Sequence, residues 1–222
     1  MAKRGPKPKG KVKIRWSADF AYGVGLIASD GNLSPDGRHI NFTTKDQELS
    51  ELFMRAFGIK VHVGRKGSGS NVVKKYYVVQ FSDSIFYSFL LQIGLTPHKS
   101  KSIGALDIPD TYFFDFLRGS FDGDGSTYSY IDPRWKSSFM YYTVFSSASR
   151  SHISWLQSVV QRHLGIKGHV TGNGRTRTAY QLKYAKKESQ LLLMTMYPPR
   201  RSLFLKRKKL KIDAMLRIIH ER

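Results

Sequence analysis

Apolar and polar residues change their spacing along the chain, and each change marks a predicted element. Residues 17–31 run small and apolar residues into Asp-Gly, which predicts a helix capped at Ser17 and ended by Gly31. Strand-like patterns follow at 38–45 and 74–83. Between them, segment 46–58 has apolar residues at helical spacing, namely Leu49, Leu52, Phe53 and Ala56.

The same order of patterns recurs in the second half of the chain. Asp30-Gly31 returns as Asp124-Gly125, 94 residues later, and the sequence FGIKVHV returns as LGIKGHV with an offset of 107. Strand-like and helical segments follow in matching order at 137–149, 152–165 and 178–187, and helical segments close the halves at 84–94, 189–197 and from 202. The sequence therefore predicts an α+β fold made of a duplicated αββαββα domain, because the period is too long for a solenoid.

Changes in composition suggest three regions. Residues 1–14 consist mainly of Pro, Gly and Lys, so we expect a mobile basic arm, either a solubilising tail or a segment that follows DNA phosphates or enters a minor groove. Pro109 and Asp110 resemble a helix start. We therefore predict an arm at 1–14, a first half at 15–106 and a second half at 107–222.

Net charge narrows the class of partner. The 37 Lys and Arg residues outnumber 16 Asp and Glu residues, which gives a formal net charge of +21 and points to a polyanion, most commonly nucleic acid. A basic membrane-surface protein is the alternative. The absence of cysteine excludes disulfides and thiolate metal sites. No apolar run reaches the roughly 20 residues needed to span a bilayer, and the start of the sequence lacks an apolar signal region. The expectation is therefore an intracellular protein, in cytoplasm, nucleoid or an organelle matrix.

Small residues four positions apart occur in both Asp-Gly helices. Gly25 and Ser29 share one helical face in the first helix, and Gly119 and Gly123 share one in the second. Such spacing lets two backbones approach closely, although a helical glycine costs about 1 kcal/mol relative to alanine. We infer that the two helices pack side by side on the axis that relates the halves.

That packing brings Asp30 and Asp124 together at two helix C-termini. Each carboxylate then faces a like charge and the negative end of a helix dipole. A divalent cation offsets both penalties, and oxygen ligands suit Mg²⁺. A single Asp-Gly is more simply a helix stop, but two at matching places in a repeat favour metal-assisted phosphodiester hydrolysis.

The stretches GVGLIASDG at 23–31 and LRGSFDGDG at 117–125 resemble the two motifs of a monomeric LAGLIDADG homing endonuclease. The resemblance covers almost the whole chain after the arm. It departs from the family pattern at the sixth motif position, where Ala28 replaces the acidic residue that the second motif keeps as Asp122. It implies that Asp30 and Asp124, with the backbone of Ser29 and Gly123, hold Mg²⁺, with Mn²⁺ as a substitute and Ca²⁺ binding without cleavage.

The resemblance also implies a lysine near each scissile phosphate. Lys99 and Lys206 are the best matches, and Lys101 and Lys208 are close competitors. As an alternative, these lysines contact phosphates for affinity only. Thr44 with Lys45, and Ser147 in the other half, are candidates for ordering water. The match is incomplete, because the position equivalent to Lys45 in the second half is Ala148.

In the family, two antiparallel sheets form a saddle over the DNA major groove, and alternate strand residues face the DNA. The alternating residues are candidates for DNA contact, although part of them can equally be solvated strand surface. The candidates in the first half are Asn32, Ser34, Arg38, His39, Asn41, Thr43, Lys45, Arg65, Lys66, Lys75, Tyr77 and Gln80. Those in the second half are Ser126, Tyr128, Tyr130, Arg134, Lys136, Tyr141, Arg175, Arg177, Gln181 and Lys183.

The implied activity is a double-strand break with 3′ overhangs in a long asymmetric target, made by a monomer in intron or intein homing. An RNA-binding intron maturase of the same fold is the alternative, with the intron RNA as a further partner. A DNA-binding protein with a disabled site is a third reading, and the two aspartates argue against it.

Overall fold

The computed structural model describes residues 10–68, 71–134, 138–172, 179–199 and 202–221. The elements of the first half are α1 (Ala18–Asp30), β1 (Gly31–Leu33), β2 (His39–Thr44), α2 (Gln47–Phe57), β3 (Val63–Ser68), β4 (Asn71–Ser82) and α3 (Ser84–Gln92). Those of the second half are η1 (Asp110–Tyr112), α4 (Phe113–Asp124), β5 (Ser126–Ile131), β6 (Phe139–Ser147), α5 (Arg150–Leu164), β7 (His169–Gly172), β8 (Tyr180–Ala185), α6 (Lys186–Met196) and α7 (Lys206–His220).

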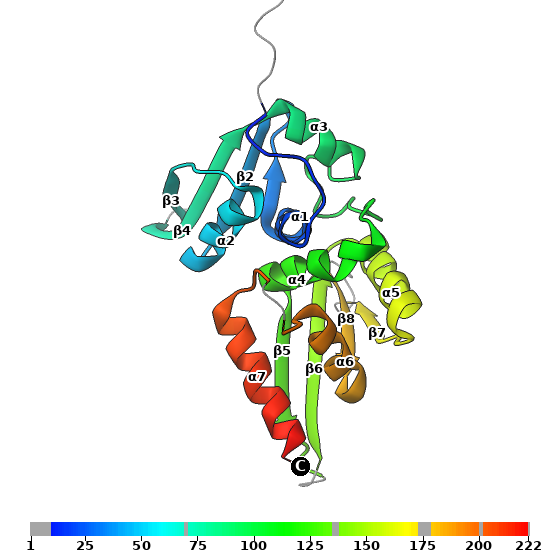
Figure 1. The fold of residues 1–222 in the computed structure, drawn as a ribbon. Coiled ribbons are helices and arrows are strands. Elements are labelled where there is room, and N and C mark those ends of the chain that lie inside the picture. The colour runs from blue at the N-terminus through cyan, green and yellow to red at the C-terminus, as the bar shows by residue number, and fades with distance from the viewer. Residues whose placement is uncertain (1–9, 69–70, 135–137, 173–178, 200–201, 222) are drawn as a thin grey trace, which may run out of the picture.

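Each half contains one four-stranded antiparallel sheet, and the two sheets have the same topology. Their strand orders are β1-β2-β4-β3 and β5-β6-β8-β7. Helices α1 and α4 lie between the sheets at the centre of the molecule (Figure 1). The predicted α+β duplication is therefore confirmed.

Helix ends explain why the two halves match in sequence where they do. Ser17 caps α1 by accepting a hydrogen bond from the Phe20 amide, and Gly31 ends it, as predicted. The recurring Gly-Ile-Lys sequences end α2 and α5, because Gly58 and Gly165 adopt the left-handed conformation at φ 63° and 69°. The strands that follow begin only at Val63 and His169.

The core runs through both halves without interruption. Central α1 is buried from Phe20 to Ile27, and a cluster of aromatic rings, including Phe42 stacked on Phe53, packs beneath the first sheet. No helix in the described part of the chain is long and apolar enough to span a bilayer.

The predicted arm is too long at its C-terminal end. The Val12 side chain is buried in the core, and the Asp83 carboxylate accepts hydrogen bonds from the Lys11 and Val12 amides at 2.6 and 2.9 Å. The same carboxylate caps α3 by accepting from the Phe86 amide. Val12, Ile14 and Trp16 alternate with basic residues, but this short pattern directly follows the Pro-, Gly- and Lys-rich segment, so composition groups its first part with the arm.

Candidate active site

Helices α1 and α4 meet along a seam that admits only small residues. A Cβ atom on Gly25 would lie 2.1 Å from the Phe116 carbonyl oxygen, and one on Gly119 would lie 2.0 Å from that of Tyr22. One level further along, a Cβ on Gly123 would lie 2.0 Å from Ser29 Oγ. The helices therefore touch backbone to backbone, as their small-residue spacing predicted.

The seam brings Asp30 and Asp124 together at its C-terminal end. Burial, followed by the neighbouring Asp124 charge, raises the pKa of Asp30 to about 7, against the lowering effects of Lys208 and Lys99. Asp124 is more exposed than Asp30, but it is still partly shielded from water, and this desolvation raises its pKa. Two carboxylates whose ionised forms are disfavoured in this way have a strong physical reason to bind a cation.

A lysine closes each end of the carboxylate pair. Lys99, 6% exposed, donates from Nζ to the Gly31 carbonyl at 2.7 Å. Lys208 donates from Nζ to the carbonyls of Phe121, Gly125 and Gly123 at 2.5, 2.7 and 3.2 Å. Gly31 and Gly125 are equivalent motif positions, so Lys99 and Lys208 are equivalent lysines. Burial lowers the pKa of each to about 8.

The choice of Lys206 as the partner of Lys99 is therefore corrected to Lys208. Lys206 is the first residue of α7, its side chain is exposed, and its backbone amide donates to Glu48 Oε1 at 3.4 Å. Lys101, the competitor of Lys99, is likewise exposed. The phase of α7 decides which lysine points toward α4, and that phase depends on where the helix begins.

Each of these lysines is carried by a segment that is anchored on the opposite half. Downstream of Lys99, the Ile103 carbonyl accepts a hydrogen bond from Ser149 Oγ at the start of α5, at 2.5 Å. Next to Lys208, Arg207 Nε donates to Asp46 Oδ2 at the start of α2, at 2.6 Å. A change in how the halves pack would therefore move both lysines relative to the carboxylates.

Asp122 holds a buried polar network under the second motif. Its fully buried carboxylate accepts from the hydroxyls of Tyr22 and Tyr197 at 2.8 and 2.6 Å, and from the Leu205 amide at 2.8 Å. Burial raises the pKa of Asp122, and these three donors and Lys208 oppose the rise. Nearby Arg118 pairs with Asp115 at 2.7 Å. The network joins α1, α4 and the segment that leads into α7.

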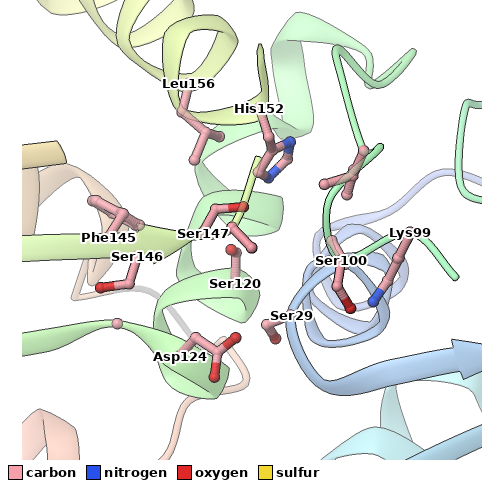
Figure 2. Close-up of a pocket in the computed structure, with 14 residues that line it drawn as sticks. Ser29, Lys99, Ser100, Ser120, Asp124, Phe145, Ser146, Ser147, His152 and Leu156 are labelled. Carbon is pink, nitrogen blue, oxygen red and sulfur yellow. The ribbon is translucent and has the colours of Figure 1, made fainter. Parts of the chain in front are cut away.

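The equivalent position of the first motif, Ala28, lines a cavity of about 230 Å³ instead. Its wall combines Lys99 and Asp124 with serine hydroxyls and His152, and Figure 2 shows these side chains around the space. His152 Nδ1 lies 2.9 Å from the Gly104 carbonyl, which can only accept, so this nitrogen carries the proton. Burial lowers the pKa of His152, which favours the neutral ring. The serines are Ser29, Ser100, Ser120, Ser146 and Ser147.

The two candidate water-ordering hydroxyls occupy equivalent places. Thr44 Oγ1 accepts from the Asp46 amide and Ser147 Oγ accepts from the Ser149 amide, both at 3.1 Å. Only Ser147 borders the cavity. Lys45 extends over the Tyr76 ring, with Nζ 5.4 Å from the ring centroid.

The open face of the first sheet matches part of the prediction. His39, Asn41 and Thr43 alternate with buried residues of β2, and Asn41 pairs with both Asn32 and Gln80 across the sheet. Lys66 pairs with Tyr76 on the same face. Ser34 and Arg38 lie in or beside the β1–β2 turn, where Asp36 accepts from Arg38 Nε at 3.5 Å and contacts His39.

Arg65 and Tyr77 are corrected to the opposite, helix-covered face. They pair with each other, Tyr77 also pairs with buried Thr44, and its hydroxyl donates to Gln47 of α2 at 3.2 Å. Alternation along β4 places Lys75 with Tyr77. The stretch Tyr76–Phe81 has apolar or aromatic residues at adjacent positions, so it gave no clear alternation from which to choose the face.

In the second sheet, Tyr141 is likewise corrected to the buried face. It is 6% exposed and alternates with Tyr142, which faces the open side with Tyr128. Ser126, Tyr130, Gln181 and Lys183 share that open face, and Arg134 pairs with Asp132 at 3.0 Å beyond β5. Lys136, Arg175 and Arg177 lie outside the described residues.

No cluster of three or more acidic or histidine side chains able to hold a metal occurs among the described residues. The candidate site therefore offers two carboxylates from protein side chains, and backbone carbonyls such as that of Gly123, which also accepts from Lys208. Oxygen-only donors of this kind suit Mg²⁺ or Mn²⁺, with water or substrate oxygens filling the remaining positions. The predicted roles of the Ser29 and Gly123 backbones stay predictions.

No family model and no curated protein sequence matches the chain. Solved structures match it in fold. The LAGLIDADG homing endonuclease I-GzeII, in complex with its DNA target, is 13% identical with a TM-score of 0.60, and the match covers 91% of each chain. I-DmoI, in complex with DNA and Ca, is 13% identical with a TM-score of 0.55, over 87% of this chain and 96% of that one.

A third match is full-length DUF199/WhiA from Thermatoga maritima, 16% identical with a TM-score of 0.59. It covers 95% of this chain, which spans 63% of the length of the WhiA protein. The chain thus has the fold of LAGLIDADG homing endonucleases, as its two motifs predicted, and shares that fold with a WhiA protein. Structural matches at identities this low show the fold alone, so the activity must be argued from the site.

Proposed function

We propose that the protein is a site-specific DNA endonuclease that hydrolyses one phosphodiester in each strand with a divalent cation. The observation that carries the proposal is the meeting of Asp30 and Asp124 at the tips of two touching helices, flanked by the equivalent lysines Lys99, which is buried, and Lys208, which is half-buried. A structural helix stop explains each Asp-Gly alone. It does not explain why two carboxylates with raised pKa values are held side by side.

When bound, a divalent cation supplies a Lewis acid for the phosphate and lowers the pKa of a water. Asp30 and Asp124 hold the cation and orient that water. Lys99 and Lys208 place positive charge beside the phosphates, where negative charge grows during attack. Their pKa values of about 8 leave both lysines largely protonated at neutral pH.

The charge and shape of the chain suit duplex DNA. The net charge of +21 supports phosphate contacts, and the open faces of the two sheets offer side chains at strand spacing to a groove. Because these faces differ in sequence, the target is long and asymmetric. The proposal includes a monomeric enzyme, 3′ overhangs and a role in intron or intein homing.

The test combines target selection with two conservative variants. A random DNA library is selected first for binding in Ca²⁺, and the recovered site is then placed in a supercoiled plasmid with Mg²⁺. Wild type is expected to linearise this plasmid. Asp30→Asn and Asp124→Asn are expected to bind the site and leave it uncut, because each loses a carboxylate that holds the cation.

Matched controls are Asp107→Asn and Asp213→Asn, which alter acidic residues away from the seam. Linearisation at the wild-type rate by either seam variant would refute the site assignment. Binding of a defined duplex by wild type without any cleavage in Mg²⁺ or Mn²⁺ would instead identify a DNA-binding protein of this fold.

A further inference from the structure

Three tyrosines form a strip on the open face of the second sheet. Tyr128 and Tyr130 of β5 are 39% and 44% exposed, and both rings stack on Tyr142 of β6. The ring centroids lie 4.9 and 6.2 Å apart, and the ring planes differ by 19° and 13°. Even-numbered residues of β5 and β6 face this open side, because Thr143 on the other side hydrogen-bonds Ser189 of α6.

The strip continues a line of cross-strand pairs that starts beside the candidate active site. Ser126, which follows Asp124-Gly125, pairs with Val144, and the next outward pairs are Tyr128 with Tyr142 and Tyr130 with Met140. The line is held rigidly, since its rings stack across neighbouring strands. A hydrogen bond with Tyr130, together with burial, raises the pKa of Tyr142 to about 12, so the Tyr142 hydroxyl stays neutral at physiological pH.

The first sheet carries a different surface at the corresponding place. Counted from the equivalent Gly31 and Gly125, the counterparts of Tyr128 and Tyr142 are Ser34 and His39, and the Ser34 amide donates to the His39 carbonyl. In the row nearer the aspartates, Asn41 pairs with Asn32 and Gln80, so that row presents amide side chains. Amides read the donor and acceptor pattern of base edges. The tyrosine strip presents aromatic rings instead, and the hydroxyls of Tyr130 and Tyr142 already hydrogen-bond each other. The apolar group that the DNA major groove offers is the thymine C5-methyl.

We propose that the strip of Tyr128, Tyr130 and Tyr142 recognises thymine methyl groups in the half of the target that lies under the second sheet. The inference rests on the proposed function, because it requires a specific duplex target. Stacking of unpaired bases fits the strip less well. Both neighbouring rings already stack on Tyr142, so the central residue has little ring face left for a base.

The experiment measures binding, so its result does not depend on cleavage. The chain has no cysteine, and a single Arg134→Cys near the end of β5 accepts a DNA-cleaving label that shows which half-site lies under the second sheet. Thymines of the selected duplex are then replaced by deoxyuridine, one half-site at a time. This change removes the methyl group and leaves the base pairing intact.

Affinity of the wild-type chain is expected to fall about fourfold for each contacted thymine replaced under the second sheet. The same replacement under the first sheet is expected to change affinity less than twofold. Tyr142→Ser should remove most of this methyl dependence, and Tyr141→Phe, on the buried face, should keep it. Since the deoxyuridine comparison uses wild-type side chains in the strip, its result stands even if Tyr142→Ser fails to fold.

Equal sensitivity of both half-sites, or none in either, would overturn the inference. So would a selected target without thymine enrichment under the second sheet, or tighter binding to single-stranded DNA than to the duplex. If the selection instead recovers no duplex at all, the proposed function fails first, and the two failures are thereby distinguished.

Discussion

In the second half of the molecule, the residue two positions before the seam aspartate is Asp122, whose buried carboxylate accepts three hydrogen bonds. In the first half, the corresponding residue is Ala28, which lines a cavity of about 230 Å³ walled by serine hydroxyls and His152. The residues at the carboxylate pair itself match, because Lys99 and Lys208 contact the carbonyls of equivalent glycines.

The comparison separates what the repeat keeps from what it varies. The helix seam, the two aspartates and the two lysines occur in both halves, as expected if they perform the same chemistry twice. The surroundings of the sixth motif position differ: a packed network with two tyrosine hydroxyls holds Asp122, whereas Ala28 lines a polar cavity that also borders Asp124. The two halves should therefore respond equally to changes at the seam and unequally to changes behind it.

The largest effect is expected at the seam glycines. Gly25→Ala and Gly119→Ala should each lower the free energy of unfolding by about 3 kcal/mol, because a Cβ at either position would overlap a carbonyl oxygen of the facing helix. Gly64→Ala is the matched control, since its Cβ would meet nothing closer than 3.7 Å. Chemical denaturation measures all three. A difference of more than about 1 kcal/mol between the two seam variants would contradict the symmetric close packing described above.

The next effect concerns the lysine of the second half. Lys208→Met should slow cleavage of the selected plasmid about a hundredfold, because a charge beside the growing negative charge on the phosphate is lost. Lys206→Met should slow it no more than about twofold, since that exposed side chain contributes only to general phosphate attraction. Single-turnover cleavage at fixed salt measures both. A larger loss of cleavage rate in Lys206→Met than in Lys208→Met would support Lys206, the residue first predicted from the sequence, as the lysine near the phosphate.

The motif positions behind the aspartates test the asymmetry directly. Asp122→Asn should cost about 2 kcal/mol of unfolding free energy, because an amide cannot accept from all three donors around it. Ala28→Ser should change stability by no more than about 0.5 kcal/mol, since the cavity has room and polar neighbours for one hydroxyl. Thermal unfolding compares the two. Equal losses of unfolding free energy in the two variants would show that the cavity beside Ala28 cannot accommodate a hydroxyl.

The smallest effect is the pH dependence of Asp30. Its pKa of about 7 in the folded protein lies above its unfolded value, so ionisation destabilises the fold increasingly as pH rises from about 4 to 7. A rise of the pKa from 3.8 to about 7 corresponds to at most about 4 kcal/mol, and solvent at this half-exposed carboxylate screens most of it. Asp30→Asn should therefore be more stable than wild type by about 1 kcal/mol at pH 8. That advantage should disappear near pH 4. Unfolding of both proteins is measured from pH 4 to pH 8 without divalent cations. An Asp30→Asn variant that is less stable than wild type at pH 8 would contradict the account.

Much of the fold could be predicted because its signals are local and periodic. The helix from Ser17 to Gly31, the amphipathic α2 and the repeated Asp-Gly and Gly-Ile-Lys sequences fix the element order in each half. The seam also followed from the four-residue spacing of Gly25 and Ser29 in one helix and of Gly119 and Gly123 in the other, since close helix contact leaves few alternatives to small residues.

Side-chain direction could be predicted less well, for identifiable reasons. Tyr141 and Tyr142 are adjacent, and both faces of β6 carry apolar residues, so only the pairing register shows which one is buried. Lys206 and Lys208 differ by the rotation of α7, which its first residue sets. The partners of Asp122 come from Tyr22, Tyr197 and Leu205, and no local pattern links positions so far apart.

The central claim is that Asp30 and Asp124 hold a divalent cation against the DNA backbone. The most direct measurement is the anomalous signal of Mn²⁺ in crystals of the chain bound to its selected duplex. We expect the signal between the two carboxylates, in contact with phosphate oxygens of the cleaved positions. Manganese bound only elsewhere, or DNA lying away from the seam, would contradict the account.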